Sequence, residues 1–107
     1  MSDINVLVID DTNFEKEVLS SKEPFLLDFG ATWCGPCKTL EPIIEKLASA
    51  TQGVLRVGKI DIDDAPNVSA RYAVRGAPTI LVFRNGEVTA RHLGVTNEKR
   101  LRELAGL

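Results

Sequence analysis

The chain has 107 residues, of which 44% are hydrophobic and 26% are charged. This length and composition exclude a disordered chain and predict one compact domain over residues 1–107. Thirteen basic and fifteen acidic residues give a net charge of −2, which argues against nucleic acid and against a membrane surface as partners. The N-terminus lacks the basic start and apolar stretch of a secretory signal, so we expect a cytoplasmic protein.

Short apolar runs alternate with amphipathic stretches in the first half of the chain, and this alternation predicts an α/β fold. Residues 6–9 predict a buried strand, after which Thr12 and Glu15 have the spacing of a capping box at a helix start. Residues 25–29 predict a central strand. Its fourth residue is Asp28, and a carboxylate inside an apolar run requires an explanation.

The alternation continues in the second half of the chain. From Pro36 onward, apolar residues recur at helical spacing and predict a long helix on the sheet, in which Pro42 predicts a kink. The remaining predicted elements are a strand over 54–62, a short helix from 65, strands over 79–83 and 87–93, and a last helix from 97. Because Asn85 and Gly86 form a strong hairpin signal, the last two strands should pair antiparallel and make the sheet mixed.

Two cysteines form the motif Cys34-Gly35-Pro36-Cys37 between the central strand and the long helix. A helix that starts near Cys34 places both sulfur atoms on one face, close enough for a disulfide. The free N–H groups and the positive dipole end of the first turn favour a thiolate at Cys34. Cys37, one turn later, is expected to be more buried and to keep its proton.

Asp28 and Lys59 are the candidate acid–base residues beside this pair. Burial should raise the proton affinity of Asp28, which could then serve as the base that deprotonates Cys37. The alternative is a carboxylate that only satisfies local hydrogen bonds. Lys59, in the apolar third strand, could tune Asp28 or simply extend its amine to solvent.

A metal site is the alternative use of the two cysteines. A structural zinc site needs four ligands, and the other soft candidate is His92, a single imidazole in a predicted strand. Asp61, Asp63 and Asp64 lack the spacing of a calcium loop and are expected to cap or precede the short helix. The sequence also shows no nucleotide-binding loop, and we predict no metal site.

The segment Trp33-Cys34-Gly35-Pro36-Cys37-Lys38 resembles the active-site motif of the thioredoxin family, and the resemblance covers nearly the whole chain. Further matching segments, in the family's order and spacing, are Asp28-Phe29, Pro42, Lys59-Ile60-Asp61-Ile62-Asp63, Arg75-Gly76-Ala77-Pro78-Thr79, Phe83, Asn85-Gly86-Glu87 and Gly94. The resemblance implies a five-stranded mixed sheet flanked by four helices and a cis peptide bond before Pro78.

The resemblance also implies a function, a protein disulfide reductase that acts by dithiol–disulfide exchange. The catalytic residues would be Cys34 as nucleophile, Cys37 as resolving thiol, and Asp28 and Lys59 as acid–base residues. The implied target-binding residues are Trp33, Gly35, Pro36, Ala77, Pro78, Gly94 and Val95. The implied partners are disulfide-containing target proteins and an NADPH-dependent thioredoxin reductase. Because that reductase would carry the cofactors, the resemblance implies that the chain itself binds no cofactor, and we expect a monomer.

Two positions depart from the family pattern. Thioredoxins commonly carry a second tryptophan three positions before Trp33, where this chain has Gly30, and a bulkier aliphatic residue where it has Ala77. Two alternatives to a reductase stay open, namely an oxidant or isomerase on the same fold and a binding module whose cysteines are incidental. The pair Gly35-Pro36 between the cysteines resembles the reducing members of the superfamily.

Overall fold

The computed structural model describes residues 5–107, and the first four residues of the predicted domain lie outside the described residues. The described chain builds a five-stranded sheet in the order β1-β3-β2-β4-β5. The strands are β1 (Val6–Ile9), β2 (Phe25–Gly30), β3 (Arg56–Asp61), β4 (Thr79–Arg84) and β5 (Glu87–Leu93). β1, β3 and β2 run parallel, whereas β4 pairs antiparallel with β2 and with β5. The predicted mixed sheet is confirmed.

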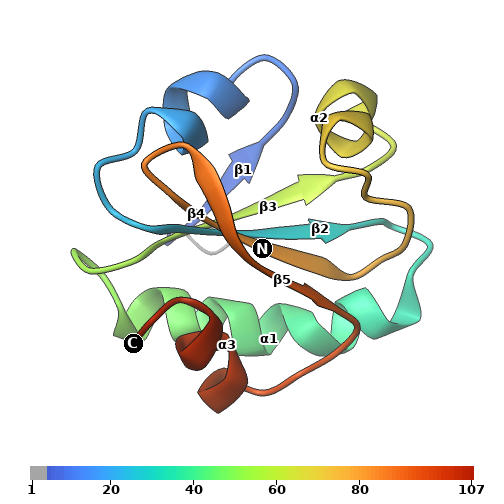
Figure 1. Ribbon diagram of the computed structural model, residues 1–107. Coiled ribbons are helices and arrows are strands. Elements are labelled where there is room, and N and C mark those ends of the chain that lie inside the picture. The colour runs from blue at the N-terminus through green and yellow to red at the C-terminus, as the bar shows by residue number, and fades with distance from the viewer. Residues whose placement is uncertain (1–4) are drawn as a thin grey trace.

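Four helices cover the two faces of the sheet. α1 (Gly35–Ala50) and α3 (Glu98–Leu104) lie on one face, and η1 (Glu15–Leu19) and α2 (Pro66–Arg71) lie on the other, as Figure 1 shows. α1 continues through Pro42 without interruption. The five-stranded sheet with four helices confirms the architecture that the resemblance implies.

The side chains of β2 alternate between two hydrophobic cores, one on each face. Leu26 belongs to the core beneath α1 and α3, whereas Leu27 and Phe29 belong to the core beneath η1 and α2. Because strand side chains alternate with a period of two, Asp28 falls on the same face as Leu26, the face that α1 covers. The pleat of the central strand therefore brings this carboxylate to the helix that carries the cysteines.

The first helix differs from its prediction because the capping box of Thr12 and Glu15 does not form. The backbone N–H groups of Thr12 and Asn13 bond instead to the carboxylate of Asp10, at 2.8 and 3.2 Å. The turn then widens into a π-helix, in which the Ser20 N–H donates to the Glu15 carbonyl at 3.0 Å.

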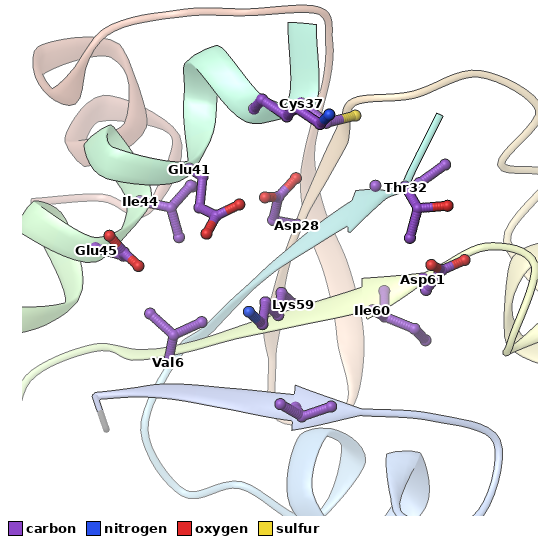
Figure 2. Close-up of a pocket in the computed structure, with 14 residues that line it drawn as sticks. Val6, Asp28, Thr32, Cys37, Glu41, Ile44, Glu45, Lys59, Ile60 and Asp61 are labelled. Carbon is purple, nitrogen blue, oxygen red and sulfur yellow. The ribbon is translucent and has the colours of Figure 1, made fainter. Parts of the chain in front are cut away.

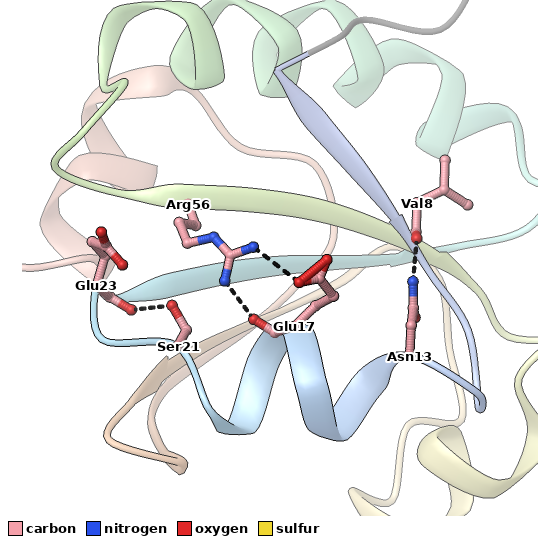
Figure 3. A network of polar contacts seen from close by, with 6 residues as sticks. All are labelled: Val8, Asn13, Glu17, Ser21, Glu23 and Arg56. Atoms are coloured by element: carbon pink, nitrogen blue, oxygen red, sulfur yellow. Dashed lines mark hydrogen bonds and ion pairs between the residues drawn. The ribbon is translucent and has the colours of Figure 1, made fainter.

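The side chains of Arg56 and Asn13 connect the region of η1 to the parallel strands β3 and β1 (Figure 3). Arg56 donates from Nη1 to the Glu17 carbonyl at 2.6 Å and also forms an ion pair with the Glu17 carboxylate at 3.4 Å. Asn13 donates from Nδ2 to the Val8 carbonyl at 2.9 Å. These contacts join η1 to β3 and the turn before η1 to β1.

Two turns set the ends of the later strands. β3 begins at Arg56, two residues after its predicted start, because the N–H groups of Val54 and Leu55 bond to Thr51 in the turn that follows α1. The hairpin at Asn85 and Gly86 is confirmed, with φ values of 53° and 80°. Positive φ at both central residues is what a type I′ turn requires.

Candidate redox site

The motif Cys34-Gly35-Pro36-Cys37 forms the first turn of α1. Cys34 is the N-cap residue with an extended backbone, and its Sγ accepts a hydrogen bond from the Cys37 N–H at 3.1 Å. Pro36 lies in the first turn, where its missing N–H leaves no intrahelical bond unmade. One of the free amide groups of the helix start is therefore aimed at the Cys34 sulfur.

Cys34 and Cys37 are joined by a disulfide, with their Cα atoms 5.3 Å apart. This separation lies within the usual range for disulfides, roughly 4.4–6.8 Å. The prediction that the spacing allows an internal disulfide is confirmed.

The exposure of the two cysteines is the reverse of what the sequence predicts. Cys34 is buried, with 4% of its surface exposed, whereas Cys37 is only partly buried. Gly30 explains the difference at Cys37, because a Cβ atom at this position would lie 3.6 Å from the Cys37 Sγ. The absent side chain leaves Cys37 uncovered, so the expectation that Cys37 is the more buried thiol is wrong for this disulfide form.

Asp28 is buried with 8% of its surface exposed, and it lies between Lys59 of β3 and Ile80 of β4 in the sheet register. Loss of hydration and, to a smaller extent, the charge of Glu41 raise the pKa of Asp28 to about 7, against the opposing charge of Lys59. Its Oδ1 has no hydrogen-bond partner among residues 5–107. A carboxyl group with this pKa can exchange a proton near neutral pH.

Lys59 and Glu41 act on Asp28 through their charge. Lys59 is partly buried, and within the described part of the chain no hydrogen bond or ion pair joins its amine to Asp28. Sequence reasoning missed Glu41, which follows Cys37 by four residues on α1. That spacing places two helical residues on one face and was the available signal. Figure 2 shows Asp28, Cys37, Glu41 and Lys59 around one pocket.

A second group of candidate residues gathers at one edge of the sheet. Thr79 pairs with Phe29 near the end of β2 and with Leu93 at the end of β5, so the segments beyond these strands meet there. The Ala77–Pro78 peptide bond is cis, which confirms what the resemblance implies. The Gly94 N–H donates to the Pro78 carbonyl at 2.8 Å and holds these two predicted residues together.

Three exposed apolar side chains occupy segments that reach this edge. Trp33, Leu93 and Val95 are 67%, 69% and 43% exposed, and exposed large apolar side chains gathered together mark interaction surfaces. Leu93 was not predicted as a site residue. Its outward orientation at the end of β5 depends on the strand register, which the sequence alone leaves open.

Two aspartates have partners that the sequence did not indicate. Asp63, expected to cap or precede α2, accepts a hydrogen bond from the Trp33 Nε1–H at 2.8 Å and so orients the indole. The N–H groups of Asn67 and Val68 at the start of α2 bond instead to Asp11, at 3.1 and 3.0 Å. Both pairings join segments far apart in the chain, so no local spacing reveals them.

Trp33 should report the redox state of the site. It is the only tryptophan of the chain and it adjoins Cys34, so the change from disulfide to dithiol alters the surroundings of a single emitter. We expect different emission intensities for the two forms, measured before and after reduction. Superimposable spectra of the two forms would show that the indole does not sense the disulfide.

Within 5–107, no group of three or more His, Cys, Asp and Glu side chains is arranged to hold a metal ion. No helix in the same range is long and apolar enough to cross a membrane.

Comparison with known proteins agrees with this geometry. The family model described as Thioredoxin matches residues 5–105. "Thioredoxin" of Acidithiobacillus ferridurans is 45% identical over 101 residues, which cover 94% of this chain and 93% of that protein. "Thioredoxin" of Thiocapsa roseopersicina is 48% identical over 90 residues, with 84% and 98% covered. "Thioredoxin M5, chloroplastic" of Oryza sativa subsp. japonica is 43% identical over 82 residues, with 77% and 48% covered.

Proposed function

Because this chain belongs to the thioredoxin family and is a thiol–disulfide oxidoreductase, we propose that it reduces disulfides of other proteins and is recycled by an NADPH-dependent thioredoxin reductase. The main support for this proposal is the position of the disulfide. The Cys34–Cys37 disulfide closes over the start of α1, where a backbone N–H points at the Cys34 sulfur. Such a position stabilises a thiolate and makes the pair reversible.

In the first step, the Cys34 thiolate attacks one sulfur of a target disulfide. A mixed disulfide forms and the second target sulfur leaves as a thiolate with the bonding electron pair. The hydrogen bond from the Cys37 N–H, 3.1 Å from Cys34 Sγ, supports the thiolate form of the nucleophile.

In the second step, Cys37 attacks the Cys34 sulfur and releases the reduced target, which leaves the internal disulfide. Cys37 must first lose its proton, and Asp28 is the proposed acceptor. A pKa of about 7 lets the Asp28 carboxylate accept this proton near neutral pH. Lys59 is proposed to keep this pKa from rising further, since its charge favours the ionised carboxyl.

The target segment is proposed to lie on the apolar edge beside Cys34. The proposed contact residues are Trp33, Gly35, Pro36, Ala77, Pro78, Gly94 and Val95, and Leu93 joins them because of its exposure. The small side chain of Ala77 makes this surface flatter, which suits recognition of backbone and shape.

We further propose that residues 1–107 act as one domain and as a monomer in the cytoplasm. A reducing compartment suits this assignment because it keeps dithiols reduced between turnovers.

Reduction of insulin disulfides tests the proposed function. With NADPH and thioredoxin reductase, the chain should precipitate the insulin B chain and consume NADPH in proportion to the disulfides reduced. The same chain alkylated at both cysteines is the control and should do neither. Equal activity of the alkylated chain would favour the binding module, and net formation of disulfides in reduced substrates would favour the oxidant.

A further inference from the structure

A pocket of about 500 Å³ lies between one face of α1 and the sheet. Its floor crosses three strands, because Val8 of β1 pairs with Lys59 of β3, which pairs with Asp28 of β2. Small-molecule sites measure roughly 300–1,000 Å³, so the pocket has the size of such a site. None of the proposed target-binding residues lines it.

Gly30 keeps space open between the end of β2 and the start of α1. It lines the pocket, and a Cβ at this position would lie 3.6 Å from the Cys37 Sγ, which is ordinary van der Waals contact. A side chain at position 30 is therefore compatible with the fold and would occupy part of the pocket. The size of residue 30 sets how much of the pocket is open to a ligand.

Asp28 presents a carboxyl group without a partner to the pocket. It is more than nine-tenths buried, with 8% of its surface exposed, and it lines the pocket. Its Oδ1 has no hydrogen-bond partner among residues 5–107, and no ion pair in that range reaches the carboxyl group. A buried acceptor without a donor is unfavourable, so a ligand that supplies an N–H group here would be bound favourably.

Glu41 reaches the same part of the pocket from α1. Figure 2 shows the side chains of Asp28 and Glu41 extending toward each other from β2 and α1. Burial raises the pKa of Asp28 most, the charge of Glu41 adds to the rise, and the charge of Lys59 offsets less than Glu41 adds. The amine that the chain itself provides therefore leaves the two facing carboxyl groups without full compensation.

The remaining charged groups of the pocket are also unpaired. They are two carboxyl groups and one further amine, those of Glu45, Asp61 and Lys38. None of the six charged side chains in the lining forms an ion pair within the described chain. Because carboxyl groups outnumber amines, the pocket attracts a cation.

Apolar side chains form another part of the lining, those of Val6, Val8, Ile44 and Ile60. Val8 is 59% exposed, so apolar surface is available to a ligand, which would be stabilised by removing that surface from water. A metal ion would leave this surface exposed, and within 5–107 no three acidic, His or Cys side chains are arranged to hold one. A cation with an apolar body uses both parts of the lining.

We infer that this pocket binds small primary amines that carry an apolar ring, with the ammonium group between the carboxyl groups of Asp28 and Glu41. The ammonium donates to acceptors that the chain leaves unpaired, and the ring covers the valine and isoleucine side chains of the lining. The pocket is separate from the proposed target-binding residues, so an amine and a target segment can be bound together.

The test titrates the oxidised chain with 2-phenylethylamine and follows the backbone amides by NMR. We expect a Kd of about 1 mM or lower, with shifts at Gly30, Cys37 and Lys59 and no comparable shifts at Leu93 and Val95. 2-Phenylethanol, which has a neutral hydroxyl in place of the ammonium, should bind about tenfold more weakly, and 3-phenylpropanoate more weakly still. Ethylamine, which lacks the ring, should also bind more weakly. Equal affinities for the amine and the alcohol overturn the inference.

Two series of variants locate the site. Gly30→Trp should weaken amine binding about tenfold or more by filling the pocket, and Gly30→Ala and Gly30→Leu should do so in smaller steps, which decides the matter if Gly30→Trp does not fold. Val54→Trp adds the same ring at an exposed position outside the pocket and should bind like the parent chain. Undiminished binding across the Gly30 series overturns the inference.

Glu41→Gln tests the position of the ammonium group. It should weaken binding of 2-phenylethylamine several-fold and leave binding of 2-phenylethanol unchanged. Asp64→Asn, which removes an exposed carboxylate outside the pocket, is the matched control and should change neither affinity. An amine affinity that Glu41→Gln does not change overturns the assignment of the ammonium.

The titration of Asp28 gives an independent measurement. A bound ammonium favours the ionised carboxyl, so 2-phenylethylamine should lower the pKa of Asp28 below about 7, whereas 2-phenylethanol should not. The ¹³C signal of the carboxyl group follows this change, and a pKa that the amine leaves unchanged overturns the inference. Insulin reduction without any amine tests the proposed function separately, because binding of the amine requires no redox step.

Discussion

Cys34→Ser should abolish insulin reduction, with a loss of roughly 10³-fold or more, because a hydroxyl at the helix start replaces the only group proposed to attack the target. Cys37→Ser should block a later step of the reaction than Cys34→Ser does. Its Cys34 still attacks the target disulfide, but no second thiol releases the product, so a mixed disulfide with Cys34 should accumulate. The measurements are insulin turnover and intact mass after incubation with a disulfide protein.

Val54→Ser is a suitable control for both variants, since Val54 is 55% exposed and lies in the turn after α1, away from the cysteines. It should retain the activity of the parent chain. A Cys34→Ser chain that turns over normally would remove Cys34 from the mechanism. Accumulation of the mixed disulfide on Cys37 in that variant would instead exchange the roles of the two thiols.

Asp28→Asn should make the chain more stable at neutral pH. Below pH 3.8 the carboxyl is protonated in both the folded and the unfolded chain. Between pH 3.8 and about 7, only the unfolded chain releases the proton, so the parent chain loses stability as pH rises. Asparagine has no proton to lose. The gain should therefore grow across this window and level off above the folded pKa, with an upper limit of about 4 kcal/mol.

Urea titrations of both chains at pH 4 and pH 8 measure this gain. Asp64→Asn is the matched control, because it removes an exposed carboxylate and should show no comparable gain with pH. An Asp28→Asn chain that is less stable than the parent at pH 8 would show that the ionised carboxylate is satisfied in the folded state.

The same variant should resolve the mixed disulfide more slowly. Asp28→Asn removes the proposed proton acceptor for Cys37, so release of the target should slow roughly tenfold or more, whereas the first attack by Cys34 changes less. Single-turnover reduction of a disulfide substrate separates the two steps. Release at the rate of the parent chain would leave Asp28 as a core carboxylate without a role in proton transfer.

Periodicity and local motifs predicted most of the fold. Alternating apolar runs gave the strands, and the Asn85-Gly86 pair gave the antiparallel hairpin, because these signals act over a few neighbouring residues. The π-helix at 15–19 was missed because the spacing of Thr12 and Glu15 predicted a capping box, whereas the Thr12 N–H donates to the Asp10 carboxylate.

The candidate site was predictable in its chemistry and less so in its exposure. The motif placed Cys34 at the N-cap of α1, and the apolar run placed Asp28 in the core. The exposure of Cys37 depends on an absent side chain at Gly30, across a contact between the end of β2 and α1. The bond from Trp33 to Asp63 likewise joins loops thirty residues apart. Such contacts depend on packing between elements, which no local pattern encodes.

The sheet separates the reactive groups, which lie on the α1 side, from a cluster of aromatic rings on the opposite side. Phe14 packs edge-on against Tyr72 and Phe83 on the η1 and α2 side, with ring centroids 5.6 and 5.7 Å apart. Asp28 and the pocket lie on the α1 side. Substitutions on opposite sides that share no contact change stability additively, within about 0.5 kcal/mol. A change of stability caused by a substitution on the α1 side can therefore be offset by a substitution in the aromatic cluster, without altering the contacts of Asp28 or Gly30.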